Sequence, residues 1–177
     1  VWLHLAVRDR SGRAVFESGA VAPNGSIAGN DSDVDPAGVE PHYTEIRTPD
    51  QVQIYESIMG DAARQPTTGL LNAVRYLKDN RLLPRGFDKA RADPWVAVVG
   101  GALEDADFSG SGDSVRYSID VAGAEGPFQV DVELRFQVIG FRWPENLRSY
   151  TAAETTRFVR YYDSMASSSS EVLAKAG

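Results

Sequence analysis

The sequence predicts a mainly β fold, an antiparallel β-sandwich followed by one or two C-terminal helices. Apolar and polar residues alternate over residues 1–8 and 128–138, as in strands with one face on a core and one in water. Clusters of Gly, Asn, Asp and Pro separate such segments, as turns do. After Pro144 the apolar spacing becomes helical, so the sheets should precede the helices.

The first half contains a hairpin and a long loop. Val1–Val7 and Ala14–Ser18 flank the turn cluster 9–12, which is the standard pattern of a hairpin. Residues 22–41 have little periodicity and are expected to form a loop whose length is unusual for a compact domain. Two short extended segments should follow at 42–47 and 52–59. Residues 67–83 fit either a helix face or a strand that leads into Asn80.

The second half contains the strongest strand signal. Trp95–Val99 is expected to be a short strand, and the segments 115–121 and 128–138 should pair antiparallel through the short linker 122–127. In the helical region, Thr151 and Glu154 have capping-box spacing, and Glu171–Ala176 is expected to form a further short helix. One domain spanning 1–177 results, with the sandwich at about 1–142 and the helices at about 144–176.

Composition excludes several classes of function. The 177 residues include no Cys, so the chain can form no disulfide, thiolate zinc site or covalent haem of its own. The net charge of -7 argues against nucleic acid as a partner. No apolar run approaches the roughly 20 residues of a membrane span. The alternating pattern starts at Val1 itself, which favours a piece of a longer protein.

The loop at residues 30–35 is the main candidate metal site. Asp31, Asp33 and Asp35 alternate along it, and oxygen ligands at alternate positions can wrap around Ca²⁺. Pro36 and His42 stand where an EF-hand needs its glycine and its bidentate glutamate. Glu40 is therefore the nearest further ligand. The alternative is a solvated polar turn whose side chains bond to their own backbone.

A second acidic segment, residues 104–113, either joins the first in space or forms a plain loop between strands, and a plain loop is favoured. Enzymatic acid–base chemistry would require the two acidic segments to face one cleft. The sequence has no phosphate-binding glycine loop, no G-x-S-x-G and no H-E-x-x-H. We therefore predict no catalytic residue, and the cofactor-binding residues are left unassigned.

His42 could ligate a metal or haem iron, or take a structural hydrogen bond, and the structural role is favoured. Six aromatic residues near the C-terminus form either a sugar-stacking platform or, as is more common, a seam that packs helix on sheet. They are Phe141, Trp143, Tyr150, Phe158, Tyr161 and Tyr162.

The order of several segments carries a resemblance to a known family. These segments are Phe16–Gly19, Gly29–Asp35, Glu40–Tyr43, Asp50–Glu56, Tyr76–Arg81 and Phe136–Gly140. In this succession they resemble the C-terminal, non-haem domain of bacterial multihaem cytochrome c-type proteins of the cytochrome c554-like group, over roughly residues 1–162. The resemblance implies a periplasmic or exported protein with C-x-x-C-H haem-binding repeats upstream. It supplies no catalytic residue.

The expected function is therefore that of a non-catalytic accessory or interaction domain of a multihaem cytochrome involved in electron transfer. Its partner would be the upstream haem domain of the same protein, and a redox partner protein is not specified. A calcium ion at Asp31–Asp35 would brace the loop. The alternative function is a carbohydrate- or ligand-binding β-sandwich module.

Overall fold

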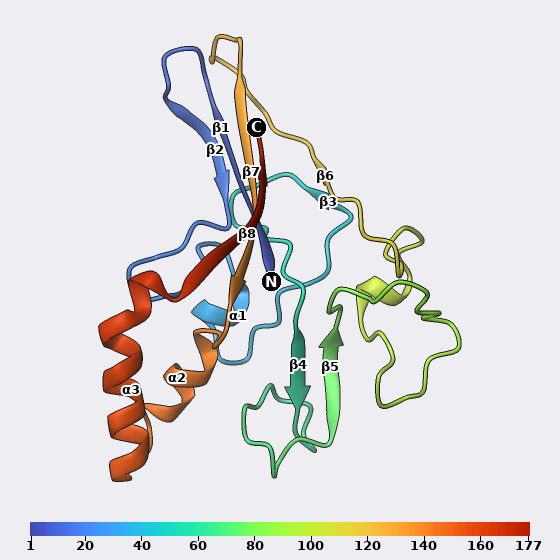
Figure 1. Ribbon diagram of the computed structural model, residues 1–177, viewed down its shortest axis with the longest axis vertical. Coiled ribbons are helices and arrows are strands. Elements are labelled where there is room, and N and C mark those ends of the chain that lie inside the picture. The colour runs from blue at the N-terminus through green and yellow to red at the C-terminus, as the bar shows by residue number, and fades with distance from the viewer.

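The computed structural model describes residues 1–177, and its main element is a four-stranded antiparallel sheet (Figure 1). The strand order is β2-β1-β7-β8. These strands span Trp2–Arg8 (β1), Ala14–Ser18 (β2), Gln129–Gln137 (β7) and Ser170–Ala176 (β8). The mainly β prediction is confirmed, and both ends of the chain meet in one sheet.

The N-terminal hairpin forms as predicted. β1 pairs antiparallel with β2, with Leu5 opposite Ser18. Asp9 closes the turn, because its Oδ1 accepts the backbone N–H groups of Ser11 at 2.9 Å and Arg13 at 3.1 Å. A short polar side chain that bonds to the following backbone is what a tight turn requires.

A short second layer covers one face of this sheet. It consists of β3 (Glu45–Ile46) and β6 (Arg116–Tyr117), which pair parallel to each other. The fully buried Ile46 packs there with Leu5, Val7 and Phe16. The sandwich is therefore small, and its second layer is a two-residue ladder flanked by loops.

The predicted antiparallel pairing of segments 115–121 and 128–138 is wrong. β7 pairs instead with β1 over seven residue pairs, from Trp2↔Arg135 to Arg8↔Gln129. That register packs Val132 against the cluster of Leu5 and Val7. β6 is only two residues long and pairs with β3, so it could not give β7 as many paired or buried residues as β1 does. The linker 122–127 therefore does not close a hairpin.

A second hairpin lies on the opposite side of the N-terminus from the β1–β2 turn (Figure 1). It comprises β4 (Ser57–Gly60) and β5 (Arg75–Asp79), which pair antiparallel. The ambiguous segment 67–83 thus contains a strand and no helix. The expected strand at 95–99 is wrong, since only Val99 bridges Asp79. A single 3-10 turn, η1 (Gly101–Leu103), follows it.

The remaining helices are short. α1 (Asp31–Val34) interrupts the long loop, and α2 (Arg142–Leu147) and α3 (Ala153–Met165) form the C-terminal helical region, followed by η2 (Ala166–Ser168). Helical spacing after Pro144 is confirmed. The capping box is wrong, because the N-cap of α3 is Ala152, which has no side-chain cap bond. No helix combines the length and the apolar character that a membrane crossing requires.

The expected helix at Glu171–Ala176 is also wrong. These residues belong to β8, which pairs with β7 from Gln137↔Ser170 to Val132↔Ala176. A helix of six residues is unstable without tertiary support. The free edge of β7 offers this segment a ladder of backbone hydrogen bonds instead.

Candidate functional site

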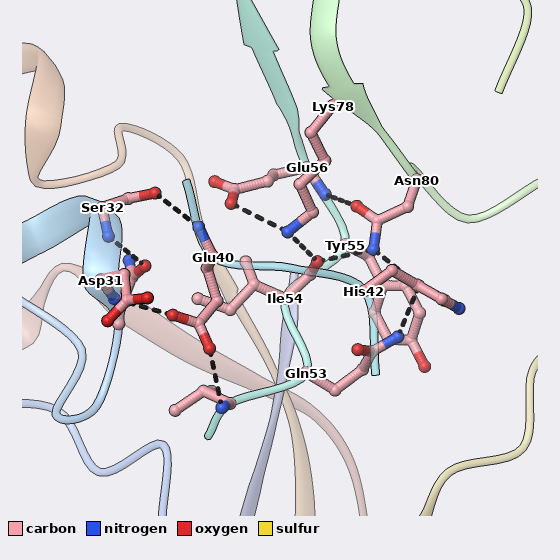
Figure 2. A network of polar contacts seen from close by, with 12 residues as sticks. Asp31, Ser32, Glu40, His42, Gln53, Ile54, Tyr55, Glu56, Lys78 and Asn80 are labelled. Atoms are coloured by element: carbon pink, nitrogen blue, oxygen red, sulfur yellow. Dashed lines mark hydrogen bonds and ion pairs between the residues drawn. The ribbon is translucent and has the colours of Figure 1, made fainter. Parts of the chain in front are cut away.

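A buried polar network gathers side chains from several loops around His42 (Figure 2). His42 leaves the long acidic loop, Gln53 and Tyr55 precede β4, and Asn80 follows the last residue of β5. The side chain of His42 is only 1% exposed. These segments are far apart in the sequence, so the network depends entirely on the tertiary fold.

Two amides fix the orientation of the network. Gln53 Oε1 accepts the backbone N–H of Tyr43 at 2.8 Å, and Asn80 Oδ1 accepts the backbone N–H of Glu56 at 3.0 Å. Each amide oxygen is thus anchored by a donor that cannot act as an acceptor. The two NH₂ groups must therefore face His42 Nδ1, at 2.9 Å from Gln53 and 3.0 Å from Asn80.

This arrangement determines the tautomer of His42. Because Nδ1 faces two donors, it must be the acceptor nitrogen, and the proton of the neutral ring must lie on Nε2. His42 Nε2 lies 3.0 Å from Asp105 Oδ2, to which it donates. Both ring nitrogens therefore have partners inside the protein.

Two aspartates from the second acidic segment complete the cluster. Asp113 Oδ2 accepts from the Tyr55 hydroxyl at 2.7 Å and from Gln53 Nε2 at 3.1 Å. Burial and the neighbouring Asp113 raise the pKa of Tyr55. Burial opposes ionisation of Asp105, but hydrogen bonds from Asp107 and His42 outweigh it and lower the pKa of Asp105. The ionised Asp105 is the acceptor that the Nε2–H tautomer requires.

His42, Asp105 and Asp113 form the one group of three histidine or carboxylate side chains close enough to share a metal ion. Their potential ligand atoms all lie within 4.8 Å of one another. A metal on His42 Nε2 would require the ring proton to move to Nδ1, since a bound imidazole normally donates through its other nitrogen. At Nδ1 that proton would point at the NH₂ groups of Gln53 and Asn80. The hydrogen bonds of the network therefore oppose metal binding through His42.

A second branch of the network is centred on Glu40, which is fully buried. Its two carboxylate oxygens accept backbone N–H groups from Asp31 at 2.7 Å and from Val52 at 3.1 Å. Its own N–H donates to Ser32 Oγ at 3.3 Å. Burial raises the pKa of Glu40. Glu40 thus connects α1 to the segment before β4 (Figure 2).

The four carboxylates predicted for Ca²⁺ do not converge. Asp33 Oδ2 accepts the backbone N–H of Ile27 at 2.7 Å, while Asp31 and Asp35 are exposed. Glu40 is taken up by the contacts described above. Residues 31–34 form a helical turn, in which positions two apart point in different directions. The calcium site gains no support from this geometry and stays a prediction.

The network also includes residues that the sequence analysis did not single out. Lys78 Nζ donates to the carbonyl oxygen of Ile54 at 3.0 Å and to Glu56 Oε1 at 3.2 Å, with its side chain 4% exposed. Burial lowers its pKa. Lys78 and Asn80 lie two residues apart and contact the same carbonyl. Their spacing of two residues within a possible strand was the available signal, but this spacing does not show that the face they share is buried.

The second acidic segment contacts His42 through Asp105, whereas Asp33 of the first acidic segment bonds to the backbone of Ile27. The carboxylates of the two segments therefore do not face a common cleft. The six C-terminal aromatic residues separate as well. Phe141 and Tyr162 are buried together, whereas Trp143, Tyr150 and Tyr161 are exposed.

No protein-family model, no curated protein and no solved structure matches this chain.

Proposed function

We propose that this chain is a non-catalytic interaction domain of an exported multihaem c-type cytochrome, where it packs against the haem-bearing part or docks a partner. The order of segments described above supports the link to such cytochromes. The observation that carries the non-catalytic role is that His42 has both ring nitrogens bonded to internal partners. A general base needs a nitrogen that can reach a substrate proton.

Exposed apolar side chains support the interaction role. Leu71 is 100% exposed, Trp95 83% and Leu70 72%. They lie in the β4–β5 connection and in the loop after β5. Leu70 and Leu71 are consecutive in the chain, and large apolar side chains left in water next to one another are typical of surfaces that another protein segment covers.

The test starts from the complete coding sequence. C-x-x-C-H repeats should lie upstream of Val1, and the full-length protein should show the absorption spectrum of c-type haem. Cross-linking followed by mass spectrometry should join the 85–96 loop to the haem-bearing part, and Trp95→Ala with Leu71→Ala should weaken those cross-links. A coding sequence without such repeats would remove the cytochrome assignment.

Calcium has its own test. Calorimetry on the chelator-treated chain should show heat on addition of Ca²⁺, and the melting temperature should rise by ligand linkage. Asp31→Asn is the matching variant, because its exposed carboxylate belongs to the predicted ligand set. An unchanged melting curve at millimolar Ca²⁺, without heat, would remove the ion from the proposal.

A second candidate is a carbohydrate- or ligand-binding module. The observation that favours it is the exposure of three C-terminal aromatic side chains, with Tyr150 62%, Tyr161 57% and Trp143 41% exposed. Sugar-binding surfaces need such accessible rings. Binding on a glycan array that disappears in Trp143→Ala would support this function, whereas an array without signal would count against it.

A further inference from the structure

An apolar groove lies between the end of β7 and the exposed face of α3. Its volume is about 340 Å³ and seven of its ten lining residues are hydrophobic. Four of these are the aromatic residues Phe136, Phe158, Tyr161 and Tyr162. The volume lies within the range of small-molecule sites, which are mostly apolar with a few polar groups.

The sequence forms the groove from two periodic patterns. Phe158, Tyr161, Tyr162 and Met165 follow helical spacing of i, i+3, i+4 and i+7, so they share one face of α3. Only Tyr162 of these is buried, in a cluster with Phe141 and Ala166. Tyr161 is 57% and Met165 63% exposed. The helix face is therefore only partly covered by its own protein.

Apart from the two tyrosine hydroxyls, the polar groups of the groove are one carboxylate and two serine hydroxyls. Glu171 is its only charged residue, and no cationic side chain lines it. Glu171 makes no ion pair in the structure. The hydroxyl groups of Ser168 and Ser169 donate to the carbonyl oxygens of Met165 at 3.0 Å and Ala166 at 2.7 Å. Ser169 Oγ already accepts a hydrogen bond from Gln137 Nε2 at 2.8 Å, so it is the Ser168 oxygen that remains available to a ligand.

These features select the charge of a ligand. The faces of aromatic rings carry negative electrostatic potential and attract cations, most strongly where water is displaced. A carboxylate without a partner adds to this attraction, and the chain as a whole has a net charge of -7. An anion would meet Glu171 with no compensating cation in the lining.

We propose that this groove binds an organic monocation with an apolar body, such as an alkylammonium compound. The apolar body lies against Phe136, Phe158 and Met165. The cationic head lies near Glu171 and Tyr162, because the guanidinium of Arg160 already lies over the Tyr161 ring, 5.6 Å from its centroid. This binding goes beyond the interaction role proposed above, and neither depends on the other.

The test compares three probes of similar size on the 177-residue chain: hexyltrimethylammonium, 1-hexanol and hexanesulfonate. Calorimetry should give an affinity for the cation roughly tenfold above that for the alcohol, and no binding of the sulfonate. Amide chemical shifts should change at residues 136–139 and 158–171. Equal affinities for the cation and the alcohol, shift changes elsewhere, or no binding of any probe would overturn the proposal.

Two variants separate charge from shape. Glu171→Gln should bring the affinity for the cation to within about threefold of that for the alcohol, while binding of the alcohol is unchanged. Glu154→Gln is the matched control, because Glu154 is exposed on α3 and does not line the groove. A fall in affinity for the cation in Glu154→Gln equal to that in Glu171→Gln would show attraction by overall charge only, and would overturn the site.

Discussion

His42 Nε2 lies 3.0 Å from Asp105 Oδ2, although 63 residues separate the two in the sequence. The contact exists because Gln53 and Asn80 hold the opposite side of the ring as an acceptor. A histidine whose side chain bonds to three separate segments in this way is an internal cross-link, so its removal should destabilise the whole fold.

The first prediction concerns this cross-link. His42→Ala should lower the free energy of unfolding by about 3 kcal/mol or more, because Asp105 and two amide NH₂ groups would lose a buried partner. Urea denaturation followed by circular dichroism measures this loss. His4→Ala is the matched control. Its contacts with Glu17 and Glu133 are partly exposed, so it should cost below about 1 kcal/mol. Equal losses for the two variants would contradict the cross-link.

The second prediction concerns the tautomer itself. In long-range ¹H–¹⁵N spectra at neutral pH, His42 should show a protonated Nε2 and an unprotonated Nδ1. The amide orientations require this, since both carbonyl oxygens accept backbone N–H groups. A spectrum with the proton on Nδ1 would mean that Gln53 and Asn80 are turned the other way.

The third prediction concerns metal ions at the same cluster. Zn²⁺ added to the chain at equimolar concentration should produce no binding heat at the His42 site, although His42, Asp105 and Asp113 lie close enough to share an ion. The reason is that Nε2, the ring nitrogen that faces Asp105, carries the ring proton and therefore has no lone pair to offer zinc. Stoichiometric heat that is lost in Asp113→Asn would refute this expectation.

The fourth prediction concerns the pH dependence of stability at Asp33. Burial raises the pKa of Asp33 to about 6, although hydrogen bonds from the backbone N–H of Ile27 and from Asn30 act to lower it. The folded state therefore holds this proton more tightly than the unfolded state does, whose pKa is about 3.9. The stabilising effect of the proton is complete below about pH 4 and is lost as the pH rises through about 6.

Asp33→Asn isolates that effect. The amide oxygen can still accept the N–H of Ile27, which Asp33 Oδ2 accepts at 2.7 Å, while the buried charge is removed. The variant should gain up to about 3 kcal/mol over the natural chain at pH 7.5 and little at pH 4. Other titrating groups cancel in this difference. A gain that does not vary between pH 4 and pH 7.5 would show that Asp33 is not the group responsible.

The fifth prediction concerns the close approach of the long loop to α3. Gly25 has φ +88°, and a Cβ there would lie 2.5 Å from Tyr162 Oη. Gly25→Ala should therefore cost about 2–3 kcal/mol, from backbone strain and from displacement of the helix. Gly12→Ala separates the two terms, because Gly12 has φ +83° with no atom within 4 Å of its Cβ position. It should cost only about 1 kcal/mol, and a similar cost at both positions would exclude crowding.

Local patterns were sufficient wherever one strand or one turn decided the outcome. The alternation in residues 129–137 identified β7, and the polar turn at Asp9 identified the hairpin. Local patterns predicted the wrong structure where a segment could pair with more than one other segment. Residues 171–176 suit a short helix by themselves, but the free edge of β7 makes them a strand.

The candidate site shows the same division. The sequence pointed to carboxylates at Asp31, Asp33 and Asp35 because they alternate along an expected loop, but the helical turn of α1 points neighbouring members of this set apart. It also favoured a structural role for His42, for which the structure supplies three buried partners, Asp105, Gln53 and Asn80.

The sequence by itself thus determined the mainly β class, the N-terminal hairpin and the helical region that follows β7, because each depends on periodicity and turn chemistry within a short window. Only the tertiary structure decided that β1 pairs with β7, that Asp105 and Asp113 meet His42, and that α3 leaves an apolar groove beside β7. These relations join residues far apart in the chain. Their free energy comes from burial and from hydrogen bonds that no local pattern specifies.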